Sequence, residues 1–226
     1  MKRIWFAMMA VLALAVFASG AQAAPTLKLD YAPPGSSTSY NNGGPFEVSN
    51  IVGGPANLVG TSFLTFCVEE NEYFSPGSSY PFSVADYAFK GGISGQQSLN
   101  QDPLSNQSAW LYWEFRNGSI ANTLPNEQAL QAAIWFLEGE QGSAGIGSQY
   151  VLNAQLAVFQ GWKNDGSVDG KIVEVLNLYT GTDPNNPDNQ AQSQLGLFSV
   201  PEPGTLLLLG SGFLAMGFGL RKRFGK

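Results

Sequence analysis

The pattern of apolar and polar positions divides the middle of the chain into strand-like and helix-like parts. Short segments in which apolar and polar residues alternate predict β-strands, and Gly-Gly, Pro-Gly and Asn- or Ser-rich stretches separate them. The predicted strands are 26–31, 46–52, 61–68, 80–89, 171–175 and 195–200. The polar stretches 33–45, 91–102 and 181–194 are expected to be loops.

Three longer segments between the fourth and fifth predicted strands have helical character. They are 106–116, 126–138 and 149–159. Asn117-Gly118 is a typical helix end, Pro125 suits the first turn of the second helix, and Ser148 is expected to cap the third. The order predicts a single α+β domain with a β-rich barrel or sandwich part and a helical insertion of about three helices.

The N-terminal residues 1–23 have the pattern of a secretory signal peptide. Lys2 and Arg3 precede an apolar run from residue 4 to about residue 17, and Ala21 and Ala23 form a small-x-small cleavage site. The apolar run is shorter than the roughly 20 residues that a membrane span prefers, which argues against an uncleaved anchor. We therefore expect an exported protein.

The C-terminal residues 200–226 form a second targeting segment. A motif at 200–204 precedes an apolar stretch, 205–220, which is predicted to cross the membrane, and a basic tail at 221–226. The defining residues are Pro201, Glu202 and Pro203 in the motif and Arg221, Lys222 and Arg223 in the tail. Basic residues after the span keep the tail cytoplasmic and leave the body, 24–199, outside.

This order of motif, apolar helix and basic end resembles the PEP-CTERM sorting signal of Gram-negative bacteria; an ordinary C-terminal anchor is the alternative. The resemblance implies an exosortase-type sorting enzyme in the inner membrane as a partner, which recognises Pro-Glu-Pro and processes the protein nearby. It implies that the protein is first anchored transiently in the inner membrane and is then located at the cell surface or in the extracellular matrix. It concerns the destination of the protein and leaves the activity of the body open.

Composition removes several functions from consideration. The chain is 44 % apolar and 12 % charged, as expected for a folded domain. The body has five basic and sixteen acidic residues, a net charge of −11, which excludes nucleic-acid binding. The chain has no histidine, which excludes Ser-His and Cys-His catalysis and imidazole-bound metals. A single cysteine, Cys67, excludes an intramolecular disulfide and a cysteine-based zinc site, and we expect no cofactor.

Two short motifs in the body resemble those of the thioester domains of bacterial surface adhesins. An aromatic-Cys-aliphatic segment is present as Phe66-Cys67-Val68, and a later helix carries Gln131-Ala132-Ala133-Ile134-Trp135. The family usually has a threonine before the glutamine, where this chain has Leu130. The resemblance covers roughly residues 60–160. Judged from the apolar segment around Cys67 alone, the alternative interpretation is that this cysteine is a small buried apolar side chain.

The resemblance implies a thioester cross-link between Cys67 and Gln131, lined by Phe66, Val68, Ala133, Ile134 and Trp135. The thiolate attacks the glutamine carboxamide and expels ammonia, and the product reacts once with an amine or hydroxyl on a partner protein or polysaccharide. No turnover results, so the protein is not expected to be an enzyme. We assign no base and no catalytic residue; Glu69, Glu70 and Glu72 are interpreted as a solvated acidic face.

Other functions stay open. A noncovalent structural or polysaccharide-associated surface protein with a buried cysteine is the main alternative. Trp110, Trp113, Trp135 and Trp162 would then line a sugar-binding groove, although aromatic residues at helical spacing usually belong to the core. Acidic loops at 165–170 and 183–188 lack the full calcium-loop pattern, and we assign no metal site. The scattered acids do not indicate the carboxylate pair of a glycosidase.

Overall fold

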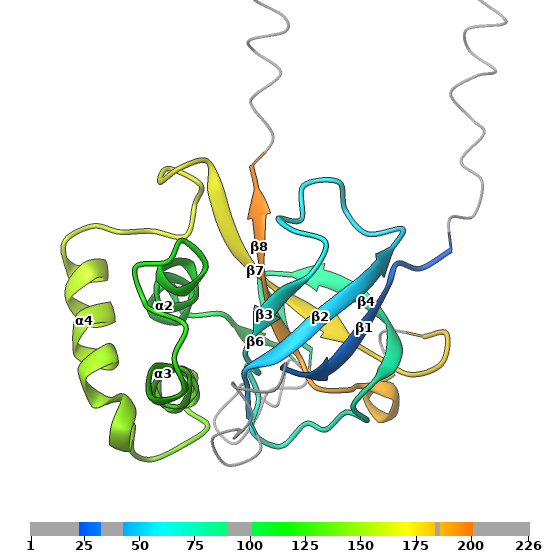
Figure 1. Cartoon of the computed structure of the whole chain (residues 1–226), viewed down its shortest axis with the longest axis horizontal. Coiled ribbons are helices and arrows are strands. Elements are labelled where there is room, and N and C mark those ends of the chain that lie inside the picture. The colour runs from blue at the N-terminus through cyan, green and yellow to red at the C-terminus, as the bar shows by residue number, and fades with distance from the viewer. Residues whose placement is uncertain (1–22, 33–42, 90–100, 184–185, 201–226) are drawn as a thin grey trace, which may run out of the picture.

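The computed structural model describes residues 23–32, 43–89, 101–183 and 186–200, and shows an antiparallel sheet beside a group of helices (Figure 1). The strands are β1 (Thr26–Tyr31), β2 (Phe46–Val52), β3 (Phe63–Thr65), β4 (Ser78–Ala85), β5 (Tyr87–Ala88), β6 (Asp102–Pro103), β7 (Lys171–Leu178) and β8 (Gln194–Ser199). The helices are α2 (Asn106–Arg116), α3 (Leu124–Leu137) and α4 (Ser148–Phe159), with short 3-10 turns η2 (Gly145–Gly147) and η3 (Pro187–Asn189). The mixed α+β class expected from the sequence is what the structure shows.

Six strands form the main sheet in the order β3-β2-β1-β4-β7-β8, with antiparallel neighbours throughout. Strand β1 shows why the sequence adopts this structure: Leu27 and Leu29 are fully buried, whereas the residues between and beside them are partly exposed. Such alternation places one face of each strand inside. A separate two-stranded ladder joins β5 and β6.

The sheet curves until its two edges nearly meet. Beyond β3, Cys67 forms an isolated antiparallel bridge with Gln194 at the start of β8. The N–H of Val68 donates to Ser193 O at 3.1 Å, and the N–H of Leu195 donates to Phe66 O at 3.2 Å. The β part is therefore an almost closed barrel, in which the segment carrying Cys67 bridges the two edges.

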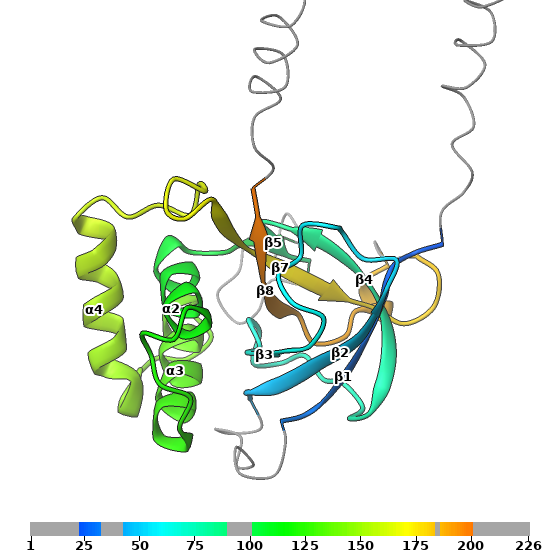
Figure 2. The same ribbon diagram turned by 45° about the horizontal axis from the view of Figure 1, so that its top comes forward.

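The three helices follow β6 and precede β7, so they are an insertion between β4 and β7, which pair with each other. They lie together on one side of the barrel (Figure 2). Ser105 caps α2 by accepting from the Ser108 N–H at 3.1 Å, and Pro125 lies in the first turn of α3. One buried apolar cluster lies between the helices and the sheet, and a second fills the barrel.

Several predicted boundaries were wrong. Strand 61–68 is reduced to β3, because the residues after Thr65 turn toward β8; strand 80–89 is two strands, β4 and β5. Helix 126–138 begins earlier, at Leu124, and the loop 181–194 contains η3. Ser148 does not cap α4: it is the first helical residue, and its hydroxyl donates to Gly145 O at 2.7 Å.

The targeting segments fall almost wholly outside the described residues. Ala23 is described and exposed, whereas Ala21, the motif at 201–204, the apolar stretch 205–220 and the basic tail are not described. Within the described ranges, no helix has the length and apolar character needed to cross a membrane. The chain enters β1 and leaves β8 on the same side of the molecule (Figure 1).

Candidate functional site

Cys67 lies where the bridging segment meets helix α3. Its side chain is fully buried and belongs to the apolar cluster inside the barrel, together with Trp135. Neighbours Phe66 and Val68 belong to the other cluster, between sheet and helices. This division follows from extended backbone, in which successive side chains point to opposite faces.

Gln131 reaches Cys67 from the middle of α3. The carboxamide Nε2 donates to Cys67 O at 2.9 Å, and Oε1 accepts from the Cys67 N–H at 3.1 Å. The Cys67 Sγ lies 3.4 Å from the same Oε1. Gln131 is fully buried, so the two motif residues, 64 positions apart in sequence, are in direct contact inside the protein.

The Gln131 carbonyl oxygen has a second backbone donor. The N–H of Gly44 donates to Oε1 at 2.8 Å, in addition to the Cys67 N–H. Two fixed N–H groups on one carbonyl oxygen are the arrangement that stabilises an oxyanion in acyl transfer. The carbon attached to this oxygen is thus polarised, with a sulfur atom beside it.

Gly43 and Gly44 belong to the site, although the sequence pattern predicts only a loop there. A Cβ on Gly43 would lie 2.6 Å from Gln131 Cγ and 2.7 Å from Trp135 Cη2. A Cβ on Gly44 would lie 2.8 Å from Thr65 O. Only glycine lets this backbone approach so closely. The available signal was the Gly-Gly-Pro string, which also occurs in ordinary turns.

The remaining motif residues support the contact from both sides of α3. Trp135 lies one turn after Gln131 on the face toward the barrel, while Ala133 and Ile134 face the cluster between sheet and helices. The Phe66 ring meets the Phe115 ring edge-on, with centroids 5.0 Å apart. Phe66 therefore packs against the helices and does not enclose the sulfur.

The surroundings keep the thiol protonated at rest. Burial raises the pKa of Cys67, an effect that outweighs the Gly44 backbone hydrogen bond, and the acids Glu72 and Glu69 raise it further. Burial and the neighbouring carboxylates, Glu140 first, raise the pKa of Glu69 to about 10. A reaction at Cys67 thus needs a group that accepts its proton, and the geometry assigns that role to no single residue.

The acids near Cys67 are not the solvated face expected from the sequence. Glu69 is fully buried and Glu72 is 6 % exposed, with Glu72 Oε2 accepting from the Ser193 N–H at 2.8 Å. The expectation failed because the bridging segment passes between the sheet edges and α3. Glu69 also meets two further acids, Asp102 and Glu140, in a cluster whose arrangement suits a metal ion.

Two other sets of candidate residues lie elsewhere. Trp110, Trp113 and Trp162 are partly buried against the helical core, away from the buried Trp135. The acidic loops considered for calcium form local turns: Asp165 Oδ1 accepts from the Ser167 N–H at 2.9 Å, and Asn186 Oδ1 accepts from the Asp188 N–H at 3.0 Å. These contacts stabilise the turns.

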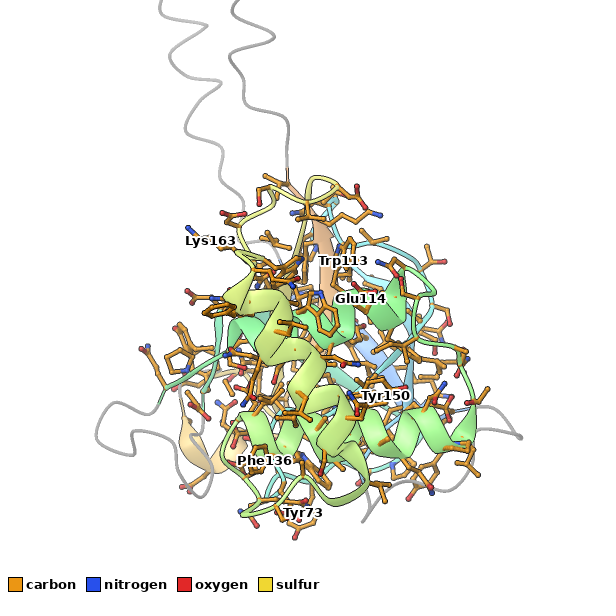
Figure 3. All side chains as sticks on the ribbon, turned by 90° about the vertical axis from the view of Figure 1, so that its left-hand side faces the viewer. Tyr73, Trp113, Glu114, Phe136, Tyr150 and Lys163 are labelled. Atoms are coloured by element: carbon orange, nitrogen blue, oxygen red, sulfur yellow. The ribbon has the colours of Figure 1, made fainter. Side chains whose placement is uncertain are left out.

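A surface cavity of about 350 Å³ lies on the helical side of the molecule. Its walls include Trp110, Glu114, Asn126, Tyr150 and Asn153. Figure 3 shows Glu114, from α2, and Tyr150, from α4, on this side of the molecule. Aromatic rings and polar side chains together are a combination that suits a small polar ligand.

Comparison with known proteins identifies the end of the chain. Residues 199–223 match the PEP-CTERM protein-sorting motif. The motif indicates an exported protein that passes the membrane, is processed by an exosortase and is sorted to the cell surface. No curated protein and no solved structure matches the chain.

Proposed function

We propose that this surface-sorted protein is a covalent adhesin, which uses an internal thioester between Cys67 and Gln131 to attach to a partner. The observation that carries the proposal is the contact of Cys67 Sγ with the Gln131 carboxamide, 3.4 Å from Oε1, with two N–H groups on that oxygen. The partner group is an amine or hydroxyl on a protein or polysaccharide. The final location is the cell surface or extracellular matrix of a Gram-negative bacterium.

The bond forms in one acyl transfer. The Cys67 sulfur attacks the Gln131 carboxamide carbon, and the Gly44 and Cys67 N–H groups stabilise the negative charge that develops on Oε1. The C–N bond then breaks, the thiol proton passes to the departing nitrogen, and one ammonia is released. The fixed contact supplies the proximity that this slow reaction needs.

The thioester is then consumed in a second acyl transfer. An amine attacks the Gln131 acyl carbon, the C–S bond breaks, and a proton moves from the amine to the sulfur. The products are an amide between Gln131 and the partner and a free Cys67 thiol. Full burial of both residues supports the survival of the thioester, because water that would hydrolyse it is excluded, and an amine reaches it only when the fold opens locally.

A noncovalent, polysaccharide-associated surface protein is the second candidate. The cavity beside Trp110 and Tyr150 favours it, because a sugar ring stacks on aromatic side chains while Glu114 and Asn153 offer polar contacts. In that case the Cys67–Gln131 hydrogen bonds would only hold α3 against the barrel. The two functions are distinguished by chemistry at Gln131.

Labelling with a small amine tests the covalent proposal. Methylamine added to the purified protein should attach to Gln131, located by peptide mapping, and release one titratable thiol at Cys67. Cys67→Ala and Gln131→Ala should each abolish the adduct. Gln128→Ala, on the same helix one turn earlier, is the matched control and should label normally. An unlabelled wild-type protein with Gln131 still a glutamine would reject the covalent function.

A further inference from the structure

Three carboxylates from separate parts of the chain converge beside the bridging segment. Glu69 follows Cys67 by two residues, Asp102 lies in β6, and Glu140 follows the end of α3. One oxygen from each carboxylate lies within 4.8 Å of the other two. The sequence hides this cluster, because its members are brought together only by the fold.

Glu69, the most deeply buried of the three carboxylates, has no hydrogen-bond partner in the part of the chain that the structure describes. Glu69 is fully buried, and neither of its carboxylate oxygens has a hydrogen-bond partner among the described residues. Asp102 Oδ2 is likewise buried without a partner in that part of the chain. A buried carboxylate normally has hydrogen bonds or a counter-charge, since its desolvation is costly. The charges that act most strongly on Glu69 are other acids, with Glu140 first and Glu72 second.

We propose that Glu69, Asp102 and Glu140 form a binding site for one calcium ion. Two oxygens bound to the same calcium, each about 2.3–2.6 Å from it, are at most about 5 Å apart. The observed limit of 4.8 Å agrees with that geometry. The three carboxylates supply up to about six oxygens, which is within the usual calcium coordination number.

The ligand chemistry favours calcium over other common ions. All the ligand atoms are oxygens, whereas zinc prefers nitrogen and sulfur ligands. Magnesium retains most of its water, which the fully buried Glu69 side of the site does not accommodate. The site is distinct from the acidic loops at 165–170 and 183–188, and it does not depend on the thioester.

The bound ion would connect three segments that hold the barrel to the helices. Glu69 belongs to the segment that bridges β3 and β8, and Glu140 belongs to the turn after α3. One existing contact joins these segments, since the Glu70 N–H donates to Glu140 Oε2 at 3.2 Å. Calcium should therefore stabilise the whole fold and not just one loop.

Thermal unfolding of the purified full chain, first treated with EDTA, tests the site. Addition of about 10 mM CaCl₂ should raise the unfolding midpoint by about 3–10 °C, if the dissociation constant is about 0.1–1 mM as in extracellular calcium modules. The same concentration of MgCl₂ should give a clearly smaller shift. Isothermal titration should show one calcium per chain.

Two isosteric variants show whether the response belongs to this cluster. Glu69→Gln removes the buried charge, so this variant should be at least as stable as wild type in EDTA and should lose most of the calcium shift. Glu70→Gln is the matched control: Glu70 Oε1 accepts from Gln141 Nε2 at 2.8 Å outside the cluster, and the shift should be retained. Asp102→Asn provides a second test of the cluster, with loss of the shift expected.

The proposal is overturned if wild type shows no saturable calcium binding, or if Glu69→Gln and Glu70→Gln respond alike. Cys67→Ala should keep the full calcium response. Failure of the thioester proposal would therefore leave this result unchanged, and failure of the calcium site would leave the chemistry at Gln131 unchanged.

Discussion

Gly44 is the position where one added methyl group should disturb both the fold and the chemistry. In Gly44→Ala, the new Cβ would lie 2.8 Å from Thr65 O and 3.0 Å from Phe66 Cα, both backbone atoms, and 3.1 Å from Gln131 Oε1. Backbone atoms in a paired segment cannot move aside independently. The strand must shift, and the 2.8 Å hydrogen bond from the Gly44 N–H to Oε1 must lengthen or break.

Two contributions set the expected size of the effect. Overpacking of this kind costs about 1–3 kcal/mol, and loss of one buried hydrogen bond costs about 1 kcal/mol more. The free energy of unfolding should thus fall by about 2–4 kcal/mol. Urea denaturation measures it, in a Cys67→Ala background so that no cross-link contributes. When Cys67 is present, Gly44→Ala should slow the release of ammonia during folding by about 10²–10³-fold, which is the usual effect of losing one oxyanion donor.

Gly142→Ala is the matched control for this substitution. A Cβ there meets nothing within 4 Å, and neither Gly44 nor Gly142 has a positive φ, so backbone conformation does not distinguish the two. This control should change stability by less than about 0.5 kcal/mol. Equal stabilities and equal rates of ammonia release in Gly44→Ala and Gly142→Ala would refute the role given to Gly44.

Two further substitutions test contacts that hold the helices and the β5 segment to the barrel. Arg116 donates to the Tyr112 hydroxyl at 2.9 Å and to Val59 O at 2.8 Å, so Arg116→Ala should lower the free energy of unfolding by about 2–3 kcal/mol in urea denaturation. Arg116→Lys keeps the charge and should recover about half of that lost free energy. An unchanged urea midpoint in both variants would contradict this. Buried Asn177 accepts from the Phe89 N–H at 2.9 Å, so Asn177→Ala should cost about 1–3 kcal/mol and accelerate hydrogen exchange at that amide, whereas unchanged exchange would argue against the contact.

The helices were the part of the fold most accessible from the sequence. Their start and end signals are local: Pro125 lies in the first turn of α3, and Asn117 ends α2. The prediction that Ser148 caps α4 was wrong because the preceding Gly145–Gly147 turn continues directly into the helix. The Ser148 hydroxyl therefore donates to the Gly145 carbonyl oxygen. The predicted strand 61–68 was too long because the residues after β3 leave that strand and pair with the start of β8, which is distant in sequence.

The candidate site was predictable only in part, for a similar reason. Two short motifs directed attention to Cys67 and Gln131, which the structure places in contact, whereas the cross-link between them stays a prediction. The Gly44 N–H donor, the close approach of Gly43 and the burial of Glu69 depend on contacts between segments far apart in sequence. A glycine pair has many uses in turns, and an acidic run is usually solvated, so neither pattern indicated the site by itself.

The mass of the intact, freshly purified protein tests the central claim most directly. Once the termini are determined by sequencing, a thioester between Cys67 and Gln131 predicts a mass one ammonia lower than that of the polypeptide, and no titratable thiol. Cys67→Ala should remove the deficit, and Gln128→Ala should retain it. A protein of full mass, with a titratable Cys67 after unfolding and an intact glutamine at 131 in peptide maps, would contradict the account.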